Sequence, residues 1–341
     1  MISPPWTRRD AVRAVAALAL GSAPGCRRVA APDSLREIKV SFVPRITVSS
    51  LFVADEQGYF RSAGLKLAPQ PVRRNENLVP LLTGGALDVG FVQISPALIN
   101  AIANGAHVRI VAGRDTASRT CGAMGVLYGK RKNFPNGLDD VRLLKGKRVS
   151  VSSPLQQTAF YLNALLASAG MTEADIHVVY LEQNNSVAAL MSGDIDVASG
   201  SYLDSVPAMS SPDIVKGIGL ADVFPGMQYN FVAFGPTLLD HDRRTGTAFL
   251  SALFQGVRAF TEGKFPRAFL ESLGGQFGID PELAVKQCRS SSVLDARIDE
   301  PSVARLVDWA VRKGFSPKRV PVADLIDTSF RDAMLAGRNG A

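Results

Sequence analysis

The chain has 341 residues, of which 46% are hydrophobic and 20% charged, with 30 glycines and 20 prolines. That is enough apolar material for two packed lobes, and the lack of long single-sign charge blocks argues against large-scale disorder. The net charge of +7 suits an anionic ligand. Because no basic stripe is interleaved with aromatic residues, we expect no nucleic-acid partner.

Residues 1–25 have the pattern of an export signal. Arg8 and Arg9 are adjacent within Thr7–Arg13, a twin-arginine pattern, and a short apolar run follows from Ala14 to Ala23. The run is shorter than the roughly 20 apolar residues needed to span a bilayer. A charged start and a short apolar run predict a cleaved leader, exported by the twin-arginine or the ordinary secretory route. The alternative is an amphipathic first helix.

The three cysteines leave their chemistry open. Cys26 follows Gly25 just after the apolar run and resembles a lipoprotein processing site, although Pro24 is unusual there. We therefore expect a periplasmic protein, or one held at the outer face of the membrane if Cys26 is lipidated. Cys121 and Cys288 either form a disulfide or remain buried thiols. No later run is long and apolar enough for a transmembrane helix.

Two stretches of the sequence repeat in the same order. Ser62–Leu65 recurs 106 positions later as Ser168–Met171, and Gly85–Gly90 recurs 108 positions later as Gly193–Ala198. Nearly equal offsets indicate an internal duplication. Asp88 and Asp196 occupy matching turns in the two copies, and we expect turn or cap roles for them rather than ligand contacts.

Each copy alternates strands and helices. The first predicts strands at 38–42, 67–72 and 89–92 and helices at 49–62 and 77–82. The second predicts strands at 147–151, 177–181 and 197–199 and helices at 157–168 and 186–191. This alternation is typical of parallel sheets covered by helices. Further along, an apolar stripe predicts a core helix, whereas Trp309 is expected at the periphery; the stripe comprises Phe249, Leu250, Leu253, Phe254 and Val257.

Several phrases in this order resemble a known family. They are Ala54-x-x-x-Gly58-Tyr59-Phe60 with Gly64-Leu65, then Leu82–Gly90, Leu144–Val149 and Leu190–Val197. The chain resembles the periplasmic solute-binding proteins of ABC importers for nitrate, taurine, alkanesulfonates and thiamine-precursor pyrimidines, over residues 38–236. Many relatives carry an aromatic–Glu–Pro phrase where this chain has Ser199–Asp204, so the identity of the ligand is not carried over.

The resemblance implies a two-lobed periplasmic-binding-protein fold of type II, in the α/β class. Each lobe is a mainly parallel sheet flanked by helices, and two crossover strands join the lobes. Lobe 1 is expected at 36–122 and 232–335 and lobe 2 at 123–231, with crossovers near 121–126 and 229–234. Such lobes close on a ligand by a hinge motion.

Ligands of such folds bind at the carboxyl ends of the strands, where helix N-termini present free N–H groups. The first lobe offers the following candidates: Phe42, Arg45, Thr47, Ser49, Asn75, Gln93, Ser95 and Arg114. The second offers Ser153, Gln156, Gln157, Thr158, Ser201, Tyr202 and Asp204, with Tyr229 and Asn230 near the return crossover.

Each candidate has a structural alternative. Arg45 and Arg114 suit an anionic group, but Arg45 is equally a solvated loop charge and Arg114 a surface ion pair. Thr47 or Ser49 can cap the next helix. Hydroxyl and amide groups at 152–158 form either a ligand cradle or helix caps. Tyr202 offers a flat apolar face to a ring or an alkyl chain.

The expected function is capture of a small polar or anionic organic molecule and its delivery to the permease and ATPase of an importer. Membrane contact is expected only through a lipid anchor or the permease. The three histidines, His107, His177 and His241, lack metal-ligand spacing, and no catalytic or cofactor motif stands out, so we expect no enzyme, metal or cofactor. The alternative is an enzyme of the same fold, of the thiamine-pyrimidine or chorismate-dehydratase type, which a retained leader would favour.

Overall fold

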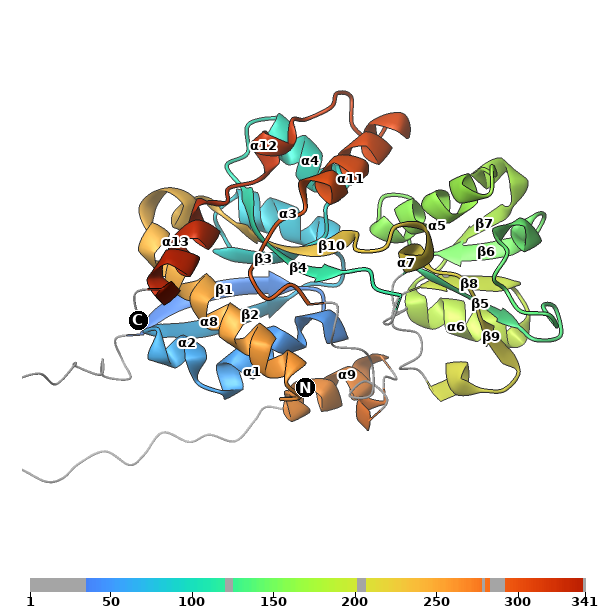
Figure 1. Cartoon of the computed structure of the whole chain (residues 1–341), viewed down its shortest axis with the longest axis horizontal. Coiled ribbons are helices and arrows are strands. Elements are labelled where there is room, and N and C mark those ends of the chain that lie inside the picture. The colour runs from blue at the N-terminus through green and yellow to red at the C-terminus, as the bar shows by residue number, and fades with distance from the viewer. Residues whose placement is uncertain (1–34, 120–124, 201–206, 278–279, 283–291, 340–341) are drawn as a thin grey trace, which may run out of the picture. The chain divides into compact units, whose positions relative to one another are not determined.

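The computed structural model describes residues 35–119, 125–200, 207–277, 280–282 and 292–339 (Figure 1). The predicted export signal at 1–25 and all three cysteines, Cys26, Cys121 and Cys288, lie outside these ranges, as do the candidates Ser201, Tyr202 and Asp204. The chain from Leu35 onward groups as one compact unit. Within the described ranges, no helix combines the length and apolar character that crossing a membrane requires.

The first sheet has five strands in the order β2-β1-β3-β10-β4. β1 pairs in parallel with β2 and β3, whereas β10 runs antiparallel to both β3 and β4. The strands are β1 (Arg36–Phe42), β2 (Leu65–Pro71), β3 (Val89–Val92), β4 (Arg109–Thr116) and β10 (Gln228–Phe234).

The second sheet repeats this plan in the order β7-β6-β8-β5-β9. β6 pairs in parallel with β7 and β8, and β5 runs antiparallel to β8 and β9. The strands are β5 (Val126–Lys130), β6 (Arg148–Val151), β7 (His177–Tyr180), β8 (Val197–Gly200) and β9 (Ile214–Lys216).

The chain passes between the two sheets twice, and each time it enters the new sheet as an antiparallel strand. β5 is the next described strand after β4 and enters the second sheet; β10 is the next strand after β9, beyond α7, and enters the first. Two crossovers therefore join two mixed α/β layers, as the resemblance implied. All of β10 belongs to the first sheet. The chain therefore returns to the first sheet at Gln228, ahead of the boundary between the lobes that was expected at 231/232.

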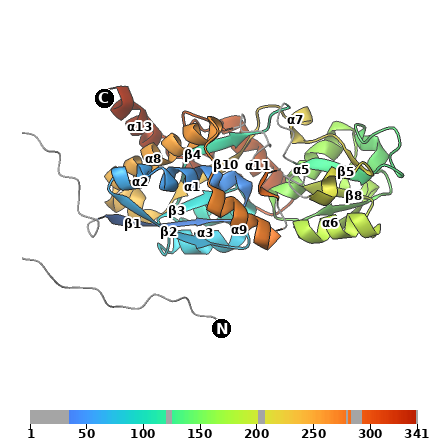
Figure 2. The same ribbon diagram turned by 90° about the horizontal axis from the view of Figure 1, so that it is seen from below.

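Helices cover both faces of the first sheet (Figures 1 and 2). One face packs against α1 (Ser49–Glu56), α2 (Tyr59–Ser62), α8 (Arg243–Thr261) and α13 (Ser329–Asn339), and the predicted stripe from Phe249 to Val257 lies in this core. The other face packs against α3 (Asn75–Thr83), α4 (Pro96–Ala103), α11 (Glu300–Arg312) and α12 (Val322–Leu325). α9 (Arg267–Phe277) adds Phe269, which stacks on Phe52 of α1 at 4.1 Å.

The second sheet packs against α5 (Gln157–Ser168) and α6 (Gln183–Ser192). α7 (Leu220–Val223) contacts α5. Short 3-10 turns occur at Ile46–Val48, Val141–Leu144, Glu173–Asp175 and Pro207–Ser210, and a π-helical turn at Thr237–His241.

One predicted helix is divided. The helix expected at 49–62 ends at Glu56 and resumes at Tyr59, because Gly58 has a φ of +73°, in the left-handed region that glycine accepts readily. The two helices contact each other, and both lie against α8.

The internal duplication extends to individual hydrogen bonds. Asp88 Oδ2 accepts a hydrogen bond from the backbone N–H of Lys39 at 2.9 Å, and Asp196 Oδ2 accepts one from Arg148 at 2.9 Å. Each aspartate thus ties the turn before the third strand of its copy to the first strand. The turn role expected of both residues is confirmed.

α11 contacts α5 across the two layers. Phe160 of α5 meets Trp309 edge-on at a centroid distance of 5.8 Å. Lys313, just after α11, donates to Glu173 at 2.7 Å. Trp309 is 4% exposed, so the prediction of a peripheral tryptophan is wrong. The apolar face of α11 carries it into the core, because Val303, Leu306 and Ala310 occupy the same side.

Candidate functional site

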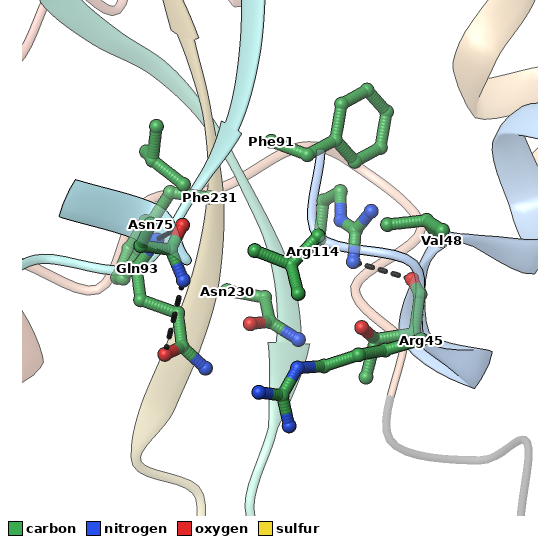
Figure 3. Close-up of a pocket in the computed structure, with 11 residues that line it drawn as sticks. Arg45, Val48, Asn75, Phe91, Gln93, Arg114, Asn230 and Phe231 are labelled. Atoms are coloured by element: carbon green, nitrogen blue, oxygen red, sulfur yellow. Dashed lines mark hydrogen bonds between the residues drawn. The ribbon is translucent and has the colours of Figure 1, made fainter. Parts of the chain in front are cut away.

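A small pocket lies at the carboxyl ends of the first sheet's parallel strands (Figure 3). It spans about 300 Å³ including space open to solvent, of which about 20 Å³ holds the centre of a water molecule. That is about the room that one water needs. The lining residues are Val43, Arg45, Thr47, Val48, Asn75, Phe91, Val92, Gln93, Arg114, Asn230 and Phe231.

Arg114 is the most constrained cation of the pocket. Its Nη2 donates to the carbonyl of Thr47 at 2.6 Å and to Asp115 Oδ2 at 2.8 Å. Its guanidinium lies over the Phe91 ring at 4.5 Å from the centroid, a favourable cation–π arrangement. The residue is only 2% exposed. The predicted surface ion pair is wrong in its setting: the pair is buried, because β10 covers one edge of β4 and residues 292–296 contact the other.

Two nitrogens of Arg114 have no hydrogen-bond partner. Nε and Nη1 are both buried and unpaired within the described structure. A buried donor left unpaired costs about 1–3 kcal/mol, and more when it is charged. A lining guanidinium with free N–H groups is therefore ready to receive a hydrogen-bond acceptor, above all an anionic one.

An irregularity of the sheet places Arg114 beside Asp115. Neighbouring residues of a regular strand point to opposite faces. Here Phe231 of β10 pairs with Gly113 while the preceding residue, Asn230, pairs with Asp115, so Arg114 is an extra residue without a partner on β10. Such bulges redirect side chains and are common beside functional sites.

Arg45 is the second cation of the pocket. It is partly buried and occupies the extended position before the 3-10 turn at Ile46–Val48, with a φ of −150°. Burial lowers the pKa of Arg45, while the charges of Glu182 and Tyr161 act in the opposite direction. Arginine keeps its proton at neutral pH even when buried. Arg45 thus brings a positive charge to the pocket wall.

Amides form the opposite wall of the pocket. Asn75 Nδ2 donates to Gln93 Oε1 at 3.4 Å, and the backbone N–H of Gln93 donates to Asn75 Oδ1 at 3.4 Å (Figure 3). Asn230 lies between this pair and the arginines. The structure thus brings together six of the predicted candidates, namely Arg45, Thr47, Asn75, Gln93, Arg114 and Asn230.

Three other first-lobe candidates do not line this pocket. Phe42 is 3% exposed and packs edge-on against Phe52 at 5.4 Å. Ser49 is fully buried at the start of α1. Ser95 caps α4 by accepting from the N–H of Leu98 at 3.4 Å. The predicted capping of α1 by Thr47 or Ser49 is wrong, because Val48 occupies the N-cap position without a side-chain hydrogen bond.

The second-lobe candidates largely bond to one another at the start of α5. Ser152 Oγ donates to Gln156 Oε1 at 2.7 Å and lies 2.7 Å from Thr158 Oγ1. Ser153 Oγ accepts from the N–H of Leu155 at 3.2 Å. These contacts make a local hydrogen-bond network ahead of α5 that does not cap the helix, because its N-cap residue, Gln156, makes no side-chain capping bond.

Gln157 and Tyr229 are buried rather than open to a ligand. Gln157 is 2% exposed; its Oε1 accepts from the Tyr161 hydroxyl at 2.6 Å, and its Nε2 has no partner in the described structure. Tyr229 is 1% exposed and belongs to the core around α11. Neither lines the pocket of the first sheet.

Asp115 and Phe91 belong to the site but are not among the residues predicted from the sequence. Asp115 Oδ2 accepts from Asn230 Nδ2 at 2.9 Å as well as from Arg114, and Asp115 Oδ1 accepts from Ser292 Oγ at 3.2 Å. A signal was present: Arg114-Asp115 is a charged pair that continues the apolar strand Ile110–Ala112. Phe91 gave none, because an aromatic residue within a strand is ordinarily a core residue.

A family model described as NMT1/THI5 like matches residues 46–263. The chain belongs to the NMT1/THI5-like family. The match begins beside Arg45 and covers every strand of the two sheets except β1. Within the described residues, no group of three or more His, Cys, Asp and Glu side chains is placed to hold a metal ion.

Two curated relatives match about two thirds of the chain. It is 25% identical over 233 residues to the nitrate import ATP-binding protein NrtC of Synechococcus elongatus, covering 66% of this chain and 35% of the relative. It is 24% identical over 228 residues to the riboflavin-binding protein RibY of Chloroflexus aurantiacus, covering 64% of this chain and 60% of the relative. The chain therefore spans less than two thirds of the length of either protein.

Solved structures share the fold at low sequence identity. A putative periplasmic sulfonate-binding protein SsuA from Methylobacillus flagellatus superposes with a TM-score of 0.70 at 16% identity, covering 90% of this chain and 96% of the other. The periplasmic nitrate-binding protein NrtA from Synechocystis gives 0.69 at 12%, covering 89% of each chain. SsuA from Escherichia coli gives 0.67 at 16%, covering 86% and 92%. The expected type II periplasmic-binding fold is confirmed.

Proposed function

We propose that this NMT1/THI5-like protein is a solute-binding component of an ABC importer. It captures a small organic molecule by an anionic or other hydrogen-bond-accepting group. The observation that carries the proposal is the pair of unpaired nitrogens on buried Arg114 in the pocket wall. The binding roles of the sulfonate-, nitrate- and riboflavin-binding relatives support it.

The electrostatics of the pocket favour this ligand chemistry. Arg114 is held in place by Thr47, Asp115 and Phe91, so it pays little conformational entropy when a ligand binds. A ligand oxygen accepting from Nε or Nη1 would replace a missing hydrogen bond with a charge-assisted one. The carboxamides of Asn75 and Gln93 offer both donors and acceptors to the rest of the molecule.

The ligand must reach beyond this pocket. The enclosed space suits one water, so a larger molecule extends outward from Arg114 past Arg45. The charges of Glu182 and Tyr161, in the second layer, raise the pKa of Arg45 against the larger effect of burial, which supports a ligand that extends toward that layer. Its buried and unpaired Gln157 Nε2 is a candidate donor when the layers close by a hinge motion.

We further propose that the protein is exported and meets the importer at the outer face of the membrane. The leader at residues 1–25 would send the protein out of the cytoplasm, and Cys26 is the candidate attachment site for lipid. The partners are the importer's permease and its ATPase. Membrane contact would occur through the permease or a lipid on Cys26.

A ligand screen followed by one substitution tests the function. Binding raises the melting temperature by mass action, so we would screen nitrate, methanesulfonate, taurine, aromatic carboxylates, pyrimidines and riboflavin. For any ligand found, we expect Arg114→Ala to weaken affinity by about a hundredfold, because a buried charged contact is worth roughly 2–5 kcal/mol. Isothermal titration calorimetry measures this loss.

The control is Arg319→Ala, which removes an exposed arginine paired with Asp308 and should leave affinity unchanged. Unchanged affinity in Arg114→Ala would contradict the assigned pocket. A protein that converts one of these compounds to a product, while no compound shifts its melting temperature, would instead be an enzyme of this fold.

A further inference from the structure

The Arg114–Asp115 pair places a negative charge against the anion-binding pocket. The pair is close, with Arg114 Nη2 2.8 Å from Asp115 Oδ2, and both side chains are largely buried, at 3% and 11% exposed. Coulomb interactions are much stronger there than between exposed groups. Asp115 therefore affects any anion that binds to Arg114.

Both neighbouring segments hold Asp115 in place. On one side, Asn230 of β10 donates to Oδ2 at 2.9 Å. On the other, Ser292 donates to Oδ1 at 3.2 Å and forms an isolated bridge with Asp115. The backbone N–H of Val293 also donates to the carbonyl of Arg114 at 2.5 Å. The bulge that brings the two charges together is thus clamped from both edges of β4.

Two arginines and one aspartate determine the charge at the wall beside Arg114. Arg45 and Arg114 are the charged residues of the lining. Asp115 is paired with Arg114, and its carboxylate offsets the charge of that arginine. The site beside Arg114 is therefore less positive than the arginine alone would make it, which favours a ligand group with one negative charge over a group with two.

We propose that Asp115 is a specificity-determining residue that restricts the ligand's acidic group to a single negative charge. The inference rests on the proposed function and adds to it the charge of the accepted group. A monoanion gains the free N–H groups of Arg114 and the charge of Arg45. The second charge of a dianion meets the Asp115 carboxylate in a poorly solvated setting, so that selectivity arises from repulsion as well as attraction.

Methanesulfonate and sulfate are suitable probes, because both are tetrahedral oxyanions of similar size and they differ by one charge. We expect the wild-type protein to bind methanesulfonate more tightly than sulfate. In Asp115→Asn, which keeps the shape of the side chain and removes its charge, the affinity for sulfate relative to methanesulfonate should rise by about tenfold. Titration calorimetry at fixed ionic strength measures both affinities.

Two variants separate charge from geometry. Ser292→Ala removes a donor to Asp115 without changing the charge, and Asp308→Asn makes the same change in net charge at an exposed pair with Arg319. Both should keep the wild-type ratio of the two affinities. A ratio that shifts in Ser292→Ala as much as in Asp115→Asn would overturn the proposal.

The affinities of the wild-type protein and of Asp115→Asn for the two probes also test the proposal. A wild-type protein that binds sulfate as tightly as methanesulfonate contradicts the role of Asp115, even if Asp115→Asn does not fold. An unchanged ratio in a folded Asp115→Asn does the same while leaving the solute-binding function intact. Binding of neither probe, nor of any other acid in the ligand screen, counts instead against the anion pocket of the proposed function.

Discussion

At the scale of single residues, the protein uses aspartates in two ways. Asp88 and Asp196 fasten equivalent turns of the two copies through backbone N–H groups, whereas Asp115 holds a cation at the pocket. The first role is local and repeats with the sequence motif. The role of Asp115 depends on the bulge in β4 and on the distant segment at Ser292, so no local sequence motif predicts it.

Asp196→Asn tests the turn role. Asp196 also accepts from Arg148 Nη2 at 3.1 Å, and hydrogen bonds from Arg148 lower the pKa of Asp196 despite the opposing effect of burial. At neutral pH we expect the substitution to lower the free energy of unfolding by about 1 kcal/mol. Urea unfolding of both proteins measures the difference.

The sign of the pH dependence follows from the lowered pKa of Asp196. The stabilisation is complete above the unfolded-state pKa of about 3.9, and it is lost as the pH falls through the lower folded-state pKa. The gap between wild type and Asp196→Asn should therefore close in acid. Asp324→Asn, at an exposed carboxylate, is the control and should change stability by less than about 0.5 kcal/mol. A gap that widens in acid would contradict this account.

At the scale of elements, close approach between helices holds the first layer together. α8 packs against α1 where Gly256 faces Ser50 and Ala54. A Cβ at Gly256 would lie 2.5 Å from the carbonyl oxygen of Ser50, nearer than real contacts allow. The missing side chain therefore sets the separation of the two helices.

Gly256→Ala should consequently force α8 and α1 apart. Overpacking of this kind typically costs about 1–3 kcal/mol, and we expect a corresponding fall in melting temperature. Gly337→Ala on α13 is the matched control, because a Cβ there meets nothing within 4 Å. It should leave stability unchanged or raise it by up to about 1 kcal/mol, since alanine favours helix. Equal effects of the two substitutions would refute the packing argument.

At the scale of the whole molecule, α11 connects the two layers. It belongs to the core of the first sheet and yet meets α5 through Phe160 and Trp309, with Lys313 bound to Glu173 nearby. The hinge motion that the proposed function implies would have to preserve this contact or slide along it. Trp309 is the only tryptophan after residue 34, so its fluorescence reports on this region.

Phe160→Ala tests the connection. Removing a buried phenylalanine typically costs about 3–5 kcal/mol, and the loss of the ring should also change the emission of Trp309. Guanidinium unfolding followed by fluorescence and by circular dichroism measures both effects. Tyr180→Ala, at a residue 52% exposed, should leave stability and emission near wild type. An unaltered Trp309 signal in Phe160→Ala would contradict the contact.

Much of the fold was readable from the sequence. Two copies of one strand–helix pattern, each with a turn glycine and an aspartate, predicted two layers and the three strands of each that pair in parallel. Helix α5 was predicted at its observed bounds, because its apolar positions recur at helical spacing. Six of the predicted candidates line one pocket, of which Arg114 and Asn230 lie within strands and the other four follow the ends of strands.

The local sequence determined the repeated units, the turn aspartates and the polar character of the loops, since each depends on neighbours a few positions away. Only the tertiary structure decided that Arg114 is buried, that Asp115 balances it and that Trp309 lies in the core. These outcomes depend on a bulge between β4 and β10 and on residues 115 to 177 positions apart in the chain. Hydrophobic periodicity predicts which face of an element is buried. The partners of a buried charge lie on segments that come together only when the chain folds, so periodicity does not predict them.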